Sequence, residues 1–182
     1  MCLRDYENIE HVSTGDLLRS EIAAKTALGK QIQKTVDEGL LVDDRSMVSL
    51  VKKHIFTRFS TKDKSVFLVD GFPRSRGNLQ AWKEHVGNSI FVAAVLNYSC
   101  PLEELKNRIM GRALQAEQVR SDDNEETVSK RFDVFEKKTR VVLDYLEENS
   151  IYPVVNIDAS KSPNAVYMET LRVVNSILSP EE

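Results

Sequence analysis

The sequence is poor in the residues that mark disulfide-stapled, metal-binding and membrane-spanning proteins. Its two cysteines, Cys2 and Cys100, are too few for the disulfide framework of a small secreted domain. Its three histidines lie far apart, and none has a cysteine or a second histidine at the spacing of a metal site. The longest apolar run, residues 90–96, is far shorter than the roughly 20 residues that span a bilayer. These absences predict a protein of a reducing compartment, the cytoplasm, without a membrane partner.

A strong excess of charge is also lacking. The net charge is −3 at pH 7, so the composition favours neither a nucleic acid nor an anionic membrane as partner. With 182 residues, of which 41% are hydrophobic, the chain is long enough to bury the core of one domain. It has no internal repeat, low-complexity tract or flexible linker. We expect a single globular domain that is a monomer when complete.

Short apolar runs alternate with segments of helical periodicity along the whole chain, which predicts an α/β fold with a parallel sheet flanked by helices. The expected strands are residues 9–13, 66–70, 90–98 and 154–157. Helices are expected at residues 14–38, from 43 to 59, around 79–82 up to about 87, from 101, from 128 to 146 and from 163. Apolar residues at three- and four-residue spacing predict two buried helix faces: Met47, Val51, Ile55 and Phe59 on one, and Val128, Phe132, Phe135, Val142 and Leu146 on the other.

The strand expected at residues 66–70 is followed by a turn and a cation. Asp70 stands where the strand ends, and Gly71 and Pro73 prevent a simple continuation. Arg74 then places a permanent positive charge beyond the carboxyl end of the strand. In open parallel sheets this end is where ligands bind. The stretch therefore predicts a ligand site, although a plain strand, turn and helix start explains it equally well.

Other arginines also stand where a ligand could bind. Arg19 also follows the end of an expected strand, and the remaining candidates flank a polar segment at residues 112–126. These candidates are Arg108, Arg112, Arg120 and Arg131. Arginine binds phosphate oxygens in a planar, bidentate manner, and phosphoryl transfer depends on such groups for positioning and charge stabilisation. Pairing with nearby acids on a solvated surface explains any single arginine, whereas the set as a whole favours phosphate.

Three motifs in the sequence resemble those of the nucleoside monophosphate kinases, and most closely the short adenylate kinases and UMP-CMP kinases. They are STGDLLRSE at 13–21, DGFPR at 70–74, and RSDDNEET at 120–127 followed by Arg131. The resemblance covers essentially the whole chain in order. It implies a P-loop-kinase-like sheet in one domain of residues 1–182, with an acceptor-binding helical region at about 14–43 and a short lid at about 112–122. It also implies that ATP and a nucleoside monophosphate are substrates, with Mg²⁺ as the cofactor that accompanies ATP.

The resemblance further implies a role for each matching residue. Arg19 and Arg74 bind the phosphate of the acceptor, in a loop with Gly71, Phe72 and Pro73. The acceptor base is surrounded by Thr14, Leu40, Leu41, Val42 and Asn78. ATP is bound by Arg108, Arg112 and Lys161. Arg112, Arg120 and Arg131 stabilise the phosphoryl group during transfer. Asp70 orders the magnesium ion through water, and Asp122 and Asp123 are weaker metal candidates.

The identity of the acceptor base depends on which of two branches of the family the chain resembles more. Adenylate kinases place a glutamine four residues after the DGFPR arginine, whereas this chain has Asn78, as UMP-CMP kinases do. IDASKS at 157–162 also resembles the pyrimidine branch. Thr14 instead resembles the adenylate kinases, because the UMP-CMP enzymes usually carry alanine there. UMP or CMP is therefore the favoured acceptor, and AMP is the alternative.

The sequence departs from the family in one large respect, because it contains no G-x-x-G-x-G-K-G-T phosphate loop and no strand ahead of one. Its only Gly-Lys pair, Gly29-Lys30, lies in the acceptor region without further glycines. In the family order the missing strand is the central one, between residues 66–70 and 90–98. We therefore expect four strands with a gap one strand wide at the centre, or that gap filled by another segment or chain, and no detectable kinase turnover. Three hypotheses remain: a kinase whose sequence lacks its own N-terminus here, a chain that binds a monophosphate without transferring phosphate, and a relic completed by another polypeptide.

Overall fold

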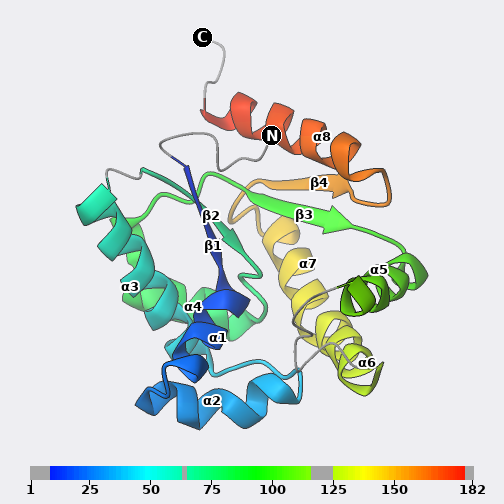
Figure 1. The fold of residues 1–182 in the computed structure, drawn as a ribbon. Helices are drawn as coiled ribbons and strands as arrows, with labels where there is room; N and C mark the ends of the chain where they lie inside the picture. Colours follow the sequence, from blue (N-terminus) through cyan, green and yellow to red (C-terminus); the bar gives the residue numbers. More distant parts are fainter. Residues whose placement is uncertain (1–8, 63–64, 116–124, 179–182) are drawn as a thin grey trace. The chain divides into compact units, whose positions relative to one another are not determined.

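The structure, a computed structural model, describes residues 9–62, 65–115 and 125–178 (Figure 1). Contacts within the chain divide it into two compact units, each described by itself below. One unit comprises Met1–Ile90 with Ser129–Val142, and the other comprises Phe91–Val128 with Leu143–Glu182. Within the described ranges, no helix is both long enough and apolar enough to cross a bilayer.

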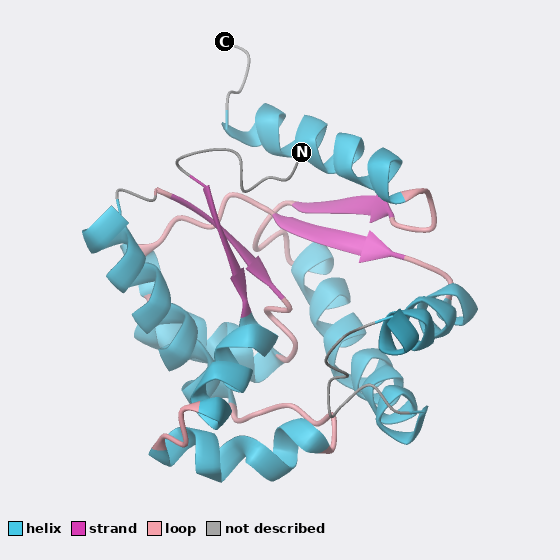
Figure 2. Ribbon diagram, viewed as in Figure 1, coloured by secondary structure: helices cyan, strands magenta, loops and turns pink. Residues whose placement is uncertain are grey.

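The first unit is built from two strands and the helices around them. Figure 2 colours the strands of the chain magenta and its helices cyan. In chain order its elements are β1 (Ile9–Ser13), α1 (Thr14–Ala23), α2 (Ala27–Asp37), α3 (Asp44–Lys62), β2 (Val66–Asp70), α4 (Arg76–His85) and a 3₁₀ turn (Gly87–Ser89). Most of α6 (Glu125–Val134), the π-helical turn Phe135–Thr139 and the start of α7 (Arg140–Glu148) also belong to it.

Strands β1 and β2 are parallel neighbours whose register runs from Ile9 opposite Val66 to Ser13 opposite Asp70. Both strands match the residues expected from the sequence. Because they are parallel and in register, their carboxyl ends lie next to each other. Helix α1, which begins at Thr14, and the loop that begins at Gly71 therefore start from the same edge of this small sheet.

The single helix expected over residues 14–38 is wrong, because the chain forms α1 and α2 with a break at residues 24–26. Thr26 begins the second helix, and its hydroxyl oxygen accepts a hydrogen bond from the Gly29 amide at 2.9 Å. Gly29 is packed directly on α1, since a Cβ there would lie 2.0 Å from the Glu21 carbonyl oxygen. The break is thus stabilised by contacts between the two helices, which composition does not reveal.

The core of the first unit contains most of the predicted face of α3. Met47, Val51 and Ile55 are buried there, and Trp82 of α4 is buried as well. The prediction for Phe59 is wrong, because this side chain is 59% exposed. A helix of 19 residues is about 28 Å long, whereas a strand of five residues spans about 17 Å, so the last turns of α3 extend past the sheet.

The second unit contains the other pair of strands, β3 (Val95–Ser99) and β4 (Val154–Asp158), with α5 (Leu102–Gln115), the end of α7 and α8 (Pro163–Leu178). The strands are parallel, with Val95 opposite Val154. The strand expected from residue 90 is therefore too long, and Phe91 is 90% exposed. The Val95 amide donates to the Pro153 carbonyl at 2.8 Å, and proline has no amide hydrogen with which to extend the ladder.

The described strands form two two-stranded sheets, β1–β2 in the first unit and β3–β4 in the second. The α/β class, the parallel strands and the flanking helices are confirmed. The gap one strand wide stays a prediction.

A π-helical turn at Phe135–Thr139 interrupts the long helical segment after residue 125. Val128, Val142 and Leu146 are buried as expected, but Phe135 is 38% exposed and its prediction is wrong. A π turn inserts one extra residue into the helical repeat. The predicted stripe assumes an uninterrupted α-helix, so it goes out of phase at this turn.

Candidate functional site

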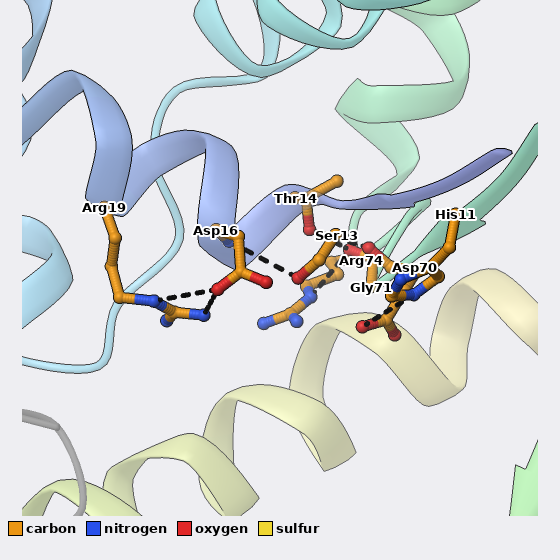
Figure 3. A network of polar contacts seen from close by, with 8 residues as sticks. All are labelled: His11, Ser13, Thr14, Asp16, Arg19, Asp70, Gly71 and Arg74. Carbon is orange, nitrogen blue, oxygen red and sulfur yellow. Dashed lines mark hydrogen bonds and ion pairs between the residues drawn. The ribbon is translucent and has the colours of Figure 1, made fainter. Parts of the chain in front are cut away.

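The site residues of the first unit gather where β1 and β2 end (Figure 3). Thr14 is buried, and its hydroxyl donates to the Asp70 carbonyl at 2.9 Å, with the Gly71 carbonyl 3.3 Å away. One side chain therefore joins the start of α1 to the loop after β2. These hydrogen bonds fix the backbone of the two segments relative to each other.

Helix α1, which follows β1 directly, carries Arg19 in its second turn. Its guanidinium lies beside Asp16, with Nε donating to the carboxylate at 3.2 Å. Gly15 makes room for the group, since a Cβ there would lie 3.2 Å from both terminal nitrogens of Arg19. The side chain is half-buried. The Arg19 guanidinium is thus held close to the end of β1, paired with a carboxylate of its own helix.

The loop after β2 carries Arg74, whose guanidinium folds back on the end of that strand (Figure 3). Its Nε donates to the Gly71 carbonyl at 2.7 Å, and its backbone carbonyl accepts from the Thr139 hydroxyl at 3.2 Å. Gly71 has a φ of +74°, and a Cβ on it would lie 2.5 Å from Nη2 of Arg74. One edge of the guanidinium is therefore fixed by the backbone of its own loop.

Phe72 and Pro73 complete this loop and anchor it to the core. The ring of Phe72 lies 5.4 Å from that of Trp82, between centroids, with a tilt of 50°. Such aromatic pairs contribute about 0.5–1.5 kcal/mol beyond the area they bury. The loop that holds Arg74 is thus attached to α4 through an aromatic contact, and Trp82 is the only tryptophan of the chain.

Asn78, the residue predicted to read the acceptor base, is only 4% exposed. Its Oδ1 accepts from the Arg74 amide at 2.9 Å, and its Nδ2 donates to Oδ1 of Asp44 at 2.6 Å. Sequence reasoning missed Asp44 as part of this site, since it placed the residue only within the helix expected from 43 to 59. The only sequence signal is that Asp44 follows the predicted acceptor segment directly.

The other acceptor candidates, Leu40, Leu41 and Val42, follow α2. Leu40 is exposed, Leu41 is half-buried and Val42 is buried in the core. The Leu40 amide already donates to the Thr35 carbonyl at 3.0 Å. This segment leads directly into Asp43 and Asp44, so it is continuous with the partners of Asn78.

Asp70 ends β2 with an exposed carboxylate, and Nε2 of His11 lies 4.0 Å from its Oδ2. Within the described ranges, no three His, Cys, Asp or Glu side chains are grouped as a metal site. A single exposed carboxylate suits a magnesium ion that keeps most of its water and is bound largely by phosphate oxygens. Asp122 and Asp123, the weaker metal candidates, lie outside the described residues.

In the second unit the structure brings together Arg108 and Lys161, both predicted to bind ATP. Arg108 donates to three successive carbonyls of the loop after β4, at 2.7 Å to Ala159, 3.2 Å to Ser160 and 3.3 Å to Lys161. Lys161 itself lies 3.8 Å from the Asp158 carboxylate. Hydrogen bonds from Ser160 are the largest cause that lowers the pKa of Asp158, with Lys161 adding to the effect. The loop is therefore a small, charged and well-connected turn.

The remaining candidates are less completely placed. Arg131 is half-buried on α6, in the first unit. Arg112 lies in α5, in the second unit, and Arg120 lies outside the described residues. The residues that the structure does bring together at the end of β1 and β2 are Thr14, Arg19, Asp70, Gly71, Arg74 and Asn78.

This arrangement suits a small anion that also carries a polar ring. One guanidinium group stands on α1 and the other on the loop after β2, these two segments are joined through Thr14, and each group is backed by a glycine that leaves it space. Arginine on a fixed scaffold binds phosphate or carboxylate oxygens in a bidentate manner. The buried amide of Asn78, in the first turn of α4, is bonded to the Arg74 backbone and adds directional hydrogen bonding there.

Replacing Gly71 by alanine is expected to lower the melting temperature markedly. The new Cβ would be strained at φ +74° and would lie 2.5 Å from Arg74 Nη2 and 2.8 Å from Thr14 Oγ1. Strain and overpacking together cost roughly 2–5 kcal/mol. Gly87→Ala is the matched control, because Gly87 has a φ of +53° but nothing within 4 Å of the added Cβ. Equal melting temperatures for the two variants would contradict the contact with Arg74.

Comparison with known proteins gives a consistent result. A sequence model described as adenylate kinase matches residues 2–151. UMP-CMP kinase 3 of Arabidopsis thaliana is 38% identical over 171 residues, which are 94% of this chain and 77% of the relative. The UMP-CMP kinase of Mus musculus is 34% identical, over 90% of this chain and 82% of its own. An adenylate kinase of Aspergillus oryzae is 31% identical, over 94% of this chain and 75% of its own.

Proposed function

The chain belongs to the adenylate kinase family of nucleoside monophosphate kinases, and on that basis we propose that its acceptor site takes UMP or CMP, for phosphorylation by ATP. The observation that carries the proposal is the joining of the start of α1 to the loop after β2 through Thr14. The first segment carries Arg19, and the second carries Arg74, whose backbone amide is bonded to the Asn78 side chain. Relatives named UMP-CMP kinase and relatives named adenylate kinase are about equally similar, so the acceptor is argued from the site.

The phosphate of the acceptor is assigned to the two arginines. The Thr14 hydroxyl joins the start of α1, which carries Arg19, to the loop that carries Arg74, so the relative position of the two arginines does not depend on the flexibility of long side chains alone. Phosphoryl transfer requires that the acceptor oxygen is held in line with the donor, which a two-armed grip on the phosphate provides. Arg131, on α6 of the same unit, is proposed to stabilise the transferred group.

The base of the acceptor is assigned to Asn78. An asparagine at this position is shared with UMP-CMP kinases, and its shorter side chain leaves less reach than the glutamine of adenylate kinases. Thr14, the one feature that resembles the adenylate kinases, is buried and bonded to loop carbonyls. That bonding explains the threonine without a contact to adenine, which supports the pyrimidine acceptor over the alternative, AMP.

The donor side of the reaction is assigned to Arg108 and Lys161 at the loop after β4, and the transferred phosphate is assigned to Arg112 and Arg120. A magnesium ion bound to ATP would neutralise charge on the phosphates, and Asp70 is the described carboxylate suited to order its water shell. The 182 residues contain no phosphate loop, so we propose that this polypeptide binds a monophosphate but does not complete the transfer by itself.

Binding is therefore the direct test of the proposal. Trp82 contacts Phe72 of the Arg74 loop, so its fluorescence is expected to change when a monophosphate occupies the site. Titration with CMP, UMP and AMP should show saturable binding, with the two pyrimidine nucleotides binding more tightly. If the folded chain binds none of the three, the proposal is wrong.

Replacing Asn78 by glutamine is expected to move the preference toward AMP. The longer amide reaches further into the base site, and one mispaired buried polar group typically changes discrimination by about tenfold or more. The ratio of dissociation constants for CMP and AMP measures this shift. Gln80→Asn, on the exposed face of the same helix, is the control for a general disturbance of α4. An unchanged ratio in Asn78→Gln would remove Asn78 from the base site.

A further inference from the structure

Asp44 is the partner that completes the environment of the Asn78 amide. Its Oδ1 accepts from Asn78 Nδ2 at 2.6 Å and also accepts a hydrogen bond from the Ser75 hydroxyl. The residue begins α3, yet its partners lie 31 and 34 positions later, on the loop and first turn of α4. It therefore joins two segments of the acceptor site that are distant in the sequence.

The hydrogen-bond chemistry leaves the Asn78 amide only one orientation. An ionised carboxylate accepts hydrogen bonds and donates none, so Asp44 selects the NH₂ end of the amide. The backbone amide of Arg74 donates and accepts none, so at 2.9 Å it selects the oxygen end. In a flipped amide, the NH₂ group would face the Arg74 N–H, donor against donor, and the oxygen would face the Asp44 carboxylate, acceptor against acceptor. What remains for a ligand is one N–H and one oxygen lone pair, in fixed places.

The carboxylate is also closely fitted to the start of α4. A Cβ on Gly77 would lie 1.9 Å from Oδ2 of Asp44, so the absence of a side chain there is what admits the carboxylate. Its neighbour Asp43 has a different task, since it is exposed and its Oδ1 accepts from the Ser46 amide at 2.9 Å. Asp43 thus caps α3, which leaves Asp44 free of that role.

We propose that Asp44 is a positioning residue that fixes the Asn78 amide and thereby sets the choice of acceptor base. The inference rests on the proposed function, since it presumes that Asn78 faces the base. Cytosine and uracil present a donor and an acceptor, respectively, at the same ring position, so an amide of fixed orientation distinguishes them. An amide that is free to flip accommodates both.

Asp44→Ala is expected to reduce the ratio of dissociation constants between the two pyrimidine monophosphates, UMP and CMP, from about tenfold toward unity. Binding of ribose 5-phosphate, which lacks a base, should change less than about twofold, because Arg19 and Arg74 are retained. Asp44→Asn should restore most of the selectivity, since its amide oxygen still accepts from Asn78. Asp43→Ala is the control for loss of a helix cap, and it should lower stability without changing selectivity.

A second measurement covers the case in which Asp44→Ala does not fold. The side-chain amide signals of Asn78, identified by their loss in Asn78→Ala, are compared by ¹⁵N NMR in the unmodified chain, Asp44→Asn and Asp43→Asn. They should shift in Asp44→Asn alone. The proposal is overturned if they do not, or if Asp44→Ala weakens ribose 5-phosphate as much as the nucleotides. If the unmodified chain binds no monophosphate, the proposed function fails and this inference falls with it.

Discussion

A polypeptide of these 182 residues is expected to show no detectable transfer of phosphate from ATP to UMP, CMP or AMP. In this family, phosphoryl transfer requires a cradle of backbone amides and a lysine around the ATP phosphates. The one Gly-Lys pair does not supply it, because the Gly29 amide donates to Thr26 and the glycine is packed on the backbone of α1. Loss of a single transition-state donor typically costs about a hundred- to a thousandfold in rate. Loss of the whole cradle together with its lysine should therefore lower the rate below what an assay can detect.

The measurement is a coupled assay for ADP formation with each monophosphate in turn. A second polypeptide, with a strand and a G-x-x-G-x-G-K-G-T loop fused ahead of Cys2, should gain turnover. The same fusion with the lysine of that loop replaced by methionine is the control. Binding of monophosphates by the unextended chain is measured in parallel, so that inactivity is separated from unfolding. Turnover by the unextended chain would refute our account of the missing cradle.

The part of the site that sequence reasoning placed correctly is encoded locally. Residues 66–74 combine a short β-branched run, a carboxylate, a turn glycine and an arginine in uninterrupted order, and the structure forms β2 and the Arg74 loop there. Strand ends in a parallel sheet lie at one edge, so the closeness of this loop to the start of α1, directly after β1, follows from the alternation of elements. The order of residues in the sequence and the rule on strand ends were sufficient to predict where these residues lie.

The part that sequence reasoning missed depends on contacts between distant residues. Asp44 lies 34 positions before Asn78, and no pattern of composition or periodicity relates the two. The break between α1 and α2 has the same origin, since Gly29 is placed by the backbone of Glu21. Phe135 shows a further limit, because the π turn that exposes it has no sequence signature in a helical repeat.

Replacing Arg74 by alanine is expected to weaken CMP and UMP binding by about ten- to 150-fold. Hydrogen bonds between charged partners contribute roughly 1.5–3 kcal/mol, and this guanidinium is already held in place, so little side-chain entropy is lost on binding. Its Nε donates to the Gly71 carbonyl at 2.7 Å, so the backbone of its own loop holds one edge of the group. Arg74→Lys should not restore full affinity, since an ammonium is a point charge that cannot bond the Gly71 carbonyl and grip two phosphate oxygens in the same geometry.

The Trp82 fluorescence titration measures this effect, with the nucleosides cytidine and uridine as ligands that lack the phosphate. Their weak binding should be the same in the variant and the unmodified chain, because only the phosphate contact is removed. Arg76→Ala is the matched control, since this arginine is exposed two positions further along, in the first turn of α4. If Arg74→Ala and Arg76→Ala weaken the nucleotides equally, the effect is one of net charge. A loss confined to Arg74 and to phosphorylated ligands places the phosphate at the joined ends of β1 and β2.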